Sequence, residues 1–163
     1  MKSLVLALTL ILGSSYASAC PLGEKETTLN VHRVMRNFGR YMSPAEEVAF
    51  KVTNPFGVEK VADQEFVDAA AKLDIAISCA DAVIANPTGE LLPDKVVFLE
   101  GQAKADYIDS YVYFMGEFKD GLAEFRDMLL ATVAQKVEVR DYAALKRKAD
   151  ELNKLINRSH KRL

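Results

Sequence analysis

The sequence predicts an all-α protein that folds as an antiparallel up-down-up-down four-helix bundle. Apolar residues recur at alternating spacings of three and four in four separate segments, which is the pattern of helices packed along one face. Clusters of turn-forming residues divide these segments, and the alternating pattern of β-strands is almost absent. Four amphipathic helices with short connections bury their apolar faces most simply against one another.

The first helix is expected over about residues 26–42. Its apolar seam consists of Val31, Met35, Phe38 and Met42. The segment Ser43-Pro44-Ala45-Glu46 resembles a capping box with proline at the first helical position. We therefore expect a break near Ser43 and a second, short helical piece that ends before the turn-forming cluster at residues 53–57.

The second helix is expected over residues 63–85, with Asp63 as its N-cap and Asn86-Pro87 as its end. Its seam consists of Phe66, Ala70, Leu73, Ile77, Ala80 and Ile84. The third and longest helix is expected over residues 96–132. Its seam consists of Ile108, Tyr111, Met115, Phe118, Leu122, Phe125 and Leu129. Residues 133–140 then form a connector with room for an extra helical turn.

The last helix is expected to begin after Asp141, whose carboxylate can cap the free N–H groups of the first turn. Its seam consists of Leu145, Ala149, Leu152 and Ile156. His160 follows Ile156 by four residues, so we expect its imidazole to point toward the bundle interior.

The first 19 residues have the pattern of a secretory signal peptide. Lys2 supplies a positive charge, residues 4–12 are apolar, and Ala17-Ser18-Ala19 is a small-x-small cleavage site. Residues 20–163 then form one bundle domain, exported to the periplasm. A formal net charge of −2 argues against a nucleic-acid partner.

Cys20 and Cys79 allow three alternatives. A disulfide between them suits an oxidising periplasm. Cys20 directly follows the cleavage site, so lipidation of Cys20 in a bacterial lipoprotein is the second alternative. Two free thiols are the third. Membrane association is expected only if Cys20 is lipidated.

Met35 and His160 are candidate ligands of a haem iron. In an up-down-up-down bundle the start of the first helix lies beside the end of the fourth, so these two residues are expected to face each other. A thioether and an imidazole on opposite sides of a flat macrocycle are a known axial pair. A methionine that fills the core and a histidine that complements its helix dipole are the plainer alternatives. His32 is the alternative to Met35 in a bis-histidine site. Helix geometry favours instead a place for His32 at the surface, where it flanks the seam.

The chain resembles the cytochrome b562 family and, more distantly, cytochrome c prime. The resemblance rests on the signal peptide, the four-helix layout and three short segments. These segments are Val34-Met35-Arg36-Asn37-Phe38, Asp141-Tyr142-Ala143-Ala144-Leu145-Lys146 and Arg158-Ser159-His160-Lys161-Arg162. It implies a noncovalent haem b with Met35 and His160 as axial ligands, because no C-x-x-C-H attachment motif precedes the histidine.

The walls of the haem pocket are expected from both early and central helices. They are Val31, Phe38, Ala80, Ile84, Leu99 and Tyr107. Arg36, with Arg33 and Arg158, is expected to meet the haem propionates.

We therefore expect a periplasmic electron-transfer protein and not an enzyme. Two axial protein ligands leave the iron no open position for a substrate. Zinc-site spacings, the Glu-x-x-His pairs of di-iron bundles and glycine-rich phosphate loops are not found. A periplasmic redox partner and a monomer or weak dimer are expected. The alternative is a haem-free periplasmic bundle that binds a protein or a small ligand.

Overall fold

The chain folds as an all-α four-helix bundle, as the sequence predicts. The structure is a computed structural model that describes residues 19–24, 26–54 and 61–162, without the side chains of residues 160–162. Its helices are α1 (Val31–Thr53), α2 (Asp63–Ala85), α3 (Gly101–Ala134) and α4 (Tyr142–Arg162). Three short 3₁₀ segments, η1 (Gly89–Leu91), η2 (Asp94–Phe98) and η3 (Val137–Val139), lie between them. No strand occurs in these described ranges. The expected signal peptide lies almost wholly outside them.

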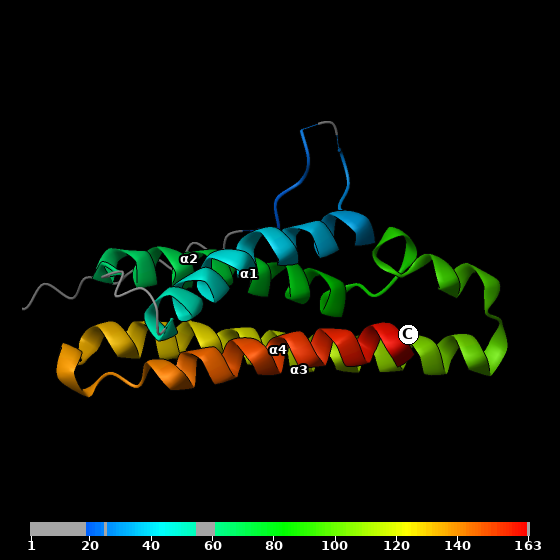
Figure 1. The fold of residues 1–163 in the computed structure, drawn as a ribbon. Helices are drawn as coiled ribbons and strands as arrows, with labels where there is room; N and C mark the ends of the chain where they lie inside the picture. The colour runs from blue at the N-terminus through cyan, green and yellow to red at the C-terminus, as the bar shows by residue number, and fades with distance from the viewer. Residues whose placement is uncertain (1–18, 25, 55–60, 163) are drawn as a thin grey trace, which may run out of the picture.

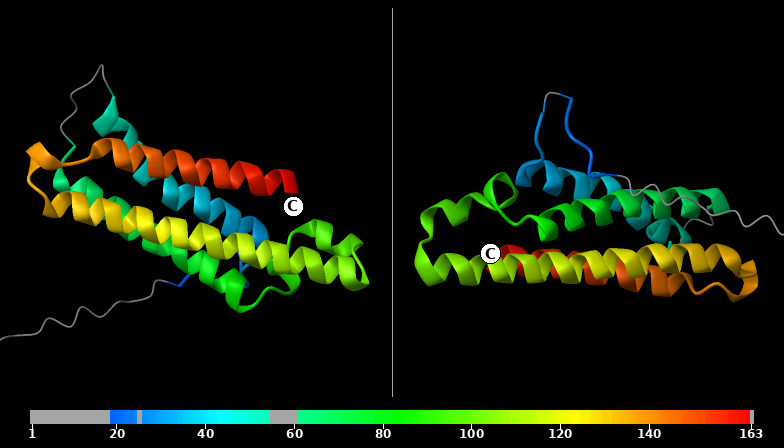
Figure 2. Two further views of the ribbon diagram at one scale, coloured as in Figure 1. Left: turned by 90° about the horizontal axis from the view of Figure 1, so that it is seen from below. Right: turned by 180° about the vertical axis from the view of Figure 1, so that it is seen from behind.

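Each helix packs against two neighbours in the order α1, α2, α3, α4 and back to α1. Figure 1 shows that successive helices run in opposite directions, and Figure 2 shows the same arrangement from below and behind. The start of α1, the end of α2 and the end of α4 therefore lie toward the same end of the bundle. At that end, the first turns of α3 and the η1–η2 connection extend past the other helices.

The first helix differs from the expectation at both of its predicted ends. It begins at Val31 because the side chain of Asn30 accepts a hydrogen bond from the Arg33 backbone N–H at 2.9 Å. It then continues through Pro44 to Thr53, so the predicted break near Ser43 is wrong. Proline removes one backbone donor, but the buried face of the helix continues beyond it through Ala45 and Val48. Packing of that face keeps the two predicted pieces together.

The second and third helices begin close to, but not at, the predicted residues. For α2 the N-cap is Ala62 and not Asp63, because the Glu65 carboxylate accepts from the Ala62 backbone N–H at 3.1 Å. For α3 the first predicted turn is the separate segment η2. Gly101 has a φ of +53°, which redirects the chain between η2 and α3.

The connector and the start of α4 agree with the prediction. The extra turn between α3 and α4 is η3, and Asp141 accepts a hydrogen bond from the Ala144 backbone N–H at 3.0 Å. Gly121 permits close packing of α3 on α4, since a Cβ there would lie 2.7 Å from Leu152 Cδ2. This glycine therefore serves the helix–helix contact.

The predicted seams form most of the core. The largest fully buried side chains are Tyr111, Phe66, Phe118, Phe125, Leu73, Met115, Leu122, Leu129 and Leu145. Ile77, Ile84 and Ile156 pack on this core while only partly buried. Met35 is the exception on the first seam, because it is 37% exposed while Val34 beside it is fully buried.

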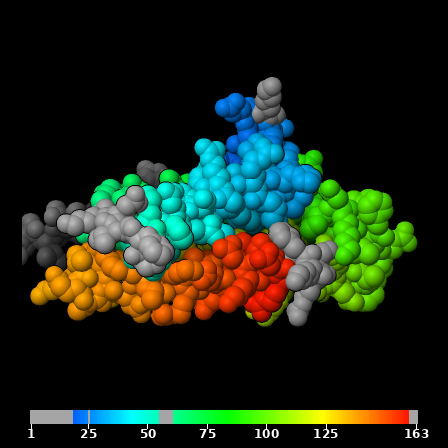
Figure 3. Space-filling model, in the orientation of Figure 1, coloured from blue at the N-terminus to red at the C-terminus, as the bar shows by residue number. Residues whose placement is uncertain are grey.

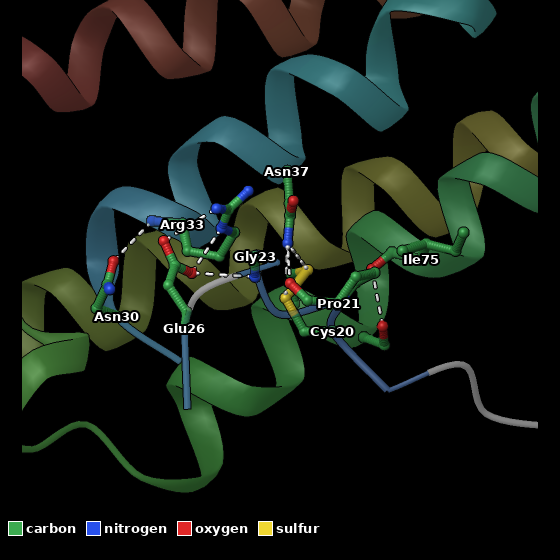
Figure 4. Close-up of a disulfide and its surroundings, with 10 residues drawn as sticks. Cys20, Pro21, Gly23, Glu26, Asn30, Arg33, Asn37 and Ile75 are labelled. Carbon is green, nitrogen blue, oxygen red and sulfur yellow. Dashed lines mark hydrogen bonds and ion pairs between the residues drawn. A yellow bond between two sulfur atoms is a disulfide. The ribbon is translucent and has the colours of Figure 1, made fainter. Parts of the chain in front are cut away.

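A disulfide joins Cys20 to Cys79, with a Cα–Cα distance of 4.6 Å. It fastens the segment before α1 to α2, and the segment then projects from the surface before it enters α1 (Figure 3). The buried Asn37 side chain donates from Nδ2 to the Pro21 carbonyl at 2.9 Å and contacts both sulfur atoms (Figure 4). Farther along the same segment, the Glu26 carboxylate accepts two hydrogen bonds from the Arg33 guanidinium.

Candidate functional site

An apolar cavity of about 460 Å³ lies at the end of the bundle where α1 begins and α4 ends. Its walls come from four elements: α1, η2 with Pro93 before it, α3 and the last turns of α4. The volume is within the range of small-molecule and cofactor pockets, about 300–1,000 Å³. This cavity is the candidate functional site.

Aromatic rings make the inner wall of the cavity. Phe38 of α1 meets Phe118 of α3 edge to face, with ring centroids 4.9 Å apart. Phe114, one turn earlier on α3, stacks on Phe118 at 6.0 Å. These contacts span two helices that are not sequence neighbours, so the packed core itself closes the inner side of the cavity.

Met35 lies on the α1 wall of this cavity. Its 37% exposure contrasts with 6% for Phe38, the next residue of the predicted seam. The difference follows from position, because Met35 borders the open cavity and Phe38 packs into its inner wall. A thioether on an apolar wall is available as a neutral, soft ligand.

Another wall of the cavity includes the end of α4. Ile156 and Ser159 both line the cavity. His160 lies in α4 one residue after Ser159 and four after Ile156. Its side chain lies outside the described residues, so its role as a ligand remains a prediction.

The other predicted site residues divide into two groups. Phe38, Tyr107 and Val31 line the cavity. Arg36 is exposed and does not line it, because one residue along a helix turns the side chain away from the face of Met35. The remaining predicted wall residues do not line it either, and these are Ala80, Ile84 and Leu99. Ala80 is fully buried in the core on α2.

The alternative ligand His32 lies at the mouth of the cavity. Its Nε2 is 3.5 Å from Asp94 Oδ2, and its side chain is 74% exposed. The expectation that His32 flanks the seam at the surface is thus confirmed. A bis-histidine site would require this ring to leave Asp94 and turn inward.

Lys95 and Tyr111 line the cavity, although sequence reasoning did not assign them to the site. The Lys95 ammonium lies 5.4 Å from the centroid of the Tyr107 ring at the mouth. Sequence spacing could not place Lys95, because it belongs to a short 3₁₀ segment without helical periodicity. Tyr111 could have been recognised from the sequence, because it places a hydroxyl on an otherwise apolar face of the third helix.

The lining of this cavity suits a noncovalent haem better than the linings of the other surface hollows do. Aromatic walls suit a flat apolar ring, Met35 offers a neutral donor, and Lys95 at the mouth suits a carboxylate. A hollow of about 430 Å³ between α3 and α4 is lined instead by charged and exposed residues such as Asp109, Glu117 and Arg158. Within the described ranges, no cluster of three or more His, Cys, Asp or Glu residues could hold a metal ion by itself.

Over the described part of the chain, no helix is long and apolar enough to span a bilayer. In comparisons with protein-family models, curated proteins and solved structures, no match to this chain was found. The functional argument therefore depends on the cavity and its residues.

Proposed function

We propose that the protein is a periplasmic electron carrier that binds a noncovalent haem b, with Met35 and His160 as axial ligands. The observation that carries this proposal is the shared cavity: Met35 and the last turns of α4 border the same apolar space. The proposed site therefore draws its two ligands from the two ends of the chain.

Each wall has a separate task in this proposal. Met35 and a neutral imidazole bring no net charge into the apolar interior, so the ligands add no ionic desolvation cost. Phe38, Phe114 and Phe118 exclude water from the inner side. Lys95 at the mouth attracts the propionates, in place of the predicted Arg36. Haem iron with both axial positions filled supplies one-electron transfer.

The disulfide supports the proposed compartment. Disulfides persist in the periplasm and are rare in the reducing cytosol. The Cys20 sulfur cannot carry a lipid while it is bonded to Cys79. We therefore propose that the protein is exported without a lipid anchor. It would then reach its periplasmic redox partner by diffusion.

The test is a hemin titration of the mature protein, followed by reduced-minus-oxidised absorption spectra. We expect stoichiometric binding and the narrow alpha band of a low-spin iron. Met35→Ala and His160→Ala should each abolish or shift that band, because each removes one axial donor. Met128→Ala is the matched control, since Met128 is a partly buried methionine of α3 that does not line the cavity.

Two outcomes would contradict the proposal. The first is a wild-type protein that binds no hemin, which would favour a haem-free bundle that uses the same cavity for another apolar ligand. The second is an unchanged band in both Met35→Ala and His160→Ala. A band that disappears in His32→Ala and His160→Ala but survives in Met35→Ala would point to the bis-histidine alternative.

A further inference from the structure

The Tyr111 hydroxyl is a buried polar group without a hydrogen-bond partner. Tyr111 is 1% exposed, and its hydroxyl is the one buried side-chain polar atom among the described residues that has no partner. A buried hydroxyl left in this state destabilises the fold, because it loses its hydrogen bonds to water and gains none in the protein. Buried polar groups in native proteins nearly always have a hydrogen-bond partner, so this exception needs an explanation.

Tyr111 lines the cavity, and the other buried side chains of the lining supply no hydrogen-bond partner for its hydroxyl. Val31, Phe38 and Phe118 are apolar. Ser159 is the other buried polar residue of the lining, but its hydroxyl donates to the Ile156 carbonyl at 2.7 Å.

The hydroxyl is suited to donate. Burial, and secondly the nearby Tyr107, raise the pKa of Tyr111 far above its usual range, so the group stays protonated at neutral pH. A donor in an apolar setting binds a charged acceptor about twice as strongly as a neutral one.

Two other residues that line the cavity, Lys95 and Tyr107, bear on the entry of an anion. Lys95 lies at the mouth over the Tyr107 ring, and Tyr107 precedes Tyr111 by one helical turn on α3. All three residues line the same cavity. A carboxylate that enters beside Lys95 would thus pass Tyr107 on its way to Tyr111.

We propose that Tyr111 is the interior hydrogen-bond donor of the cavity and holds a carboxylate oxygen of the bound ligand, with Lys95 as the cation at the mouth. The ligand class is therefore a flat apolar molecule with a carboxylate at one edge. This inference rests on the proposed function, because for haem b the carboxylate is a propionate.

The experiment compares hemin affinity and apo-protein stability in the wild type, Tyr111→Phe and Tyr113→Phe. Tyr113 is the matched control: it is two residues away on α3, 67% exposed, hydrogen-bonded to Glu117 and not part of this cavity. We expect Tyr111→Phe to weaken hemin binding about three- to tenfold, the value of one hydrogen bond. Its urea midpoint without hemin should not fall, because the variant removes an unsatisfied group. Tyr113→Phe should bind hemin as the wild type does.

A second arm replaces hemin by its dimethyl ester, in which the oxygens carry no charge. The loss caused by Tyr111→Phe should shrink for the ester, and an equal loss for both ligands would overturn the carboxylate assignment. Unchanged hemin affinity in Tyr111→Phe, with binding intact in the wild type, would overturn this inference alone. A stability loss that matches the affinity loss would overturn it too, by showing a packing role. Failure of the wild type to bind hemin would overturn the proposed function and this inference together.

Discussion

Single side chains at the disulfide show how one polar residue can organise a buried junction. Asn37 is 2% exposed and directs its amide to the Pro21 carbonyl, between the two sulfur atoms (Figure 4). On the sequence, Asn37 stood beside Met35 as part of a family-like segment and had no assigned role. Its function is visible only when Cys20 and Cys79 are joined, because its acceptor belongs to the segment that the disulfide holds.

Replacement of Asn37 by alanine should lower the free energy of unfolding by about 1–3 kcal/mol, because the partly buried Pro21 carbonyl loses its donor. Urea denaturation under non-reducing conditions measures this change. Asn153→Ala is the control, since the Asn153 amide donates to Glu46 at the exposed surface, and it should cost less than about 0.5 kcal/mol. Equal losses in the two variants would contradict the special role of Asn37.

At the scale of elements, the connections between helices contribute to stability as well as the helices themselves. Arg140 follows η3 and donates to both oxygens of Asp63, the first residue of α2, at 2.6 and 3.2 Å. The Arg140 side chain is only 5% exposed and also donates to the Gln135 carbonyl. This one side chain fastens the α3–α4 connection to the start of α2, at the end of the bundle opposite the cavity.

This ion pair should make stability depend on pH at the acid end. The hydrogen bond from Arg140 lowers the pKa of Asp63, so the pair stabilises the fold fully above the ordinary aspartate pKa of about 4. The contribution disappears as the pH falls through the lowered pKa. Asp63→Asn should therefore have a lower urea midpoint than the wild type near pH 7, and the gap should narrow near pH 2.

Asp68→Asn is the control for that measurement, because Asp68 lies on the same helix and accepts from Gln64 at the exposed surface. Its difference from the wild type should be small at both pH values. A gap for Asp63→Asn that is unchanged in acid would show that the carboxylate charge contributes nothing.

Helical periodicity predicted the bundle well and its local details less well. The predicted seam of α3 contains nearly all of its buried residues, because packing dominates there and repeats every three or four residues. The buried face of α2 is wider than its predicted seam, since it also includes Ala69, Ala76, Cys79 and Val83. The break at Ser43 was wrong because tertiary packing of Ala45 and Val48 outweighed a local capping signal. Among the residues that line the cavity, Met35 and Phe38 could be predicted from the same periodicity. Lys95 could not, because its 3₁₀ segment of five residues is too short for a periodic pattern to be recognised.

At the scale of the whole molecule, the disulfide joins segments 59 residues apart in the sequence. A cross-link of that span removes many conformations from the unfolded chain, and its expected contribution is about 2–4 kcal/mol. The bundle also has a continuous core, so the cross-link adds to a fold that already has its own packing.

The double variant Cys20→Ala, Cys79→Ala should therefore remain folded and helical but unfold at a lower urea concentration. Circular dichroism of the oxidised wild type, the reduced wild type and the variant measures the difference. The reduced wild type and the variant should agree closely. A midpoint that reduction leaves unchanged would contradict a stabilising cross-link.

The N-terminal disulfide should also make the start of α1 unfold locally less readily than the end of α4, although both line the cavity. The chain enters α1 a short loop after its covalent anchor, and Asn37 returns to that anchor from the second turn. Among the described side chains of residues 156–159, none makes a hydrogen bond or ion pair with another element, so this part of α4 is held to its neighbours by packing. The ends of free helices fray first, so hydrogen exchange should be slow over residues 34–38 and faster over 156–162. We therefore expect the cavity to have one fixed wall, which carries Met35, and one wall at the end of α4 that opens more readily.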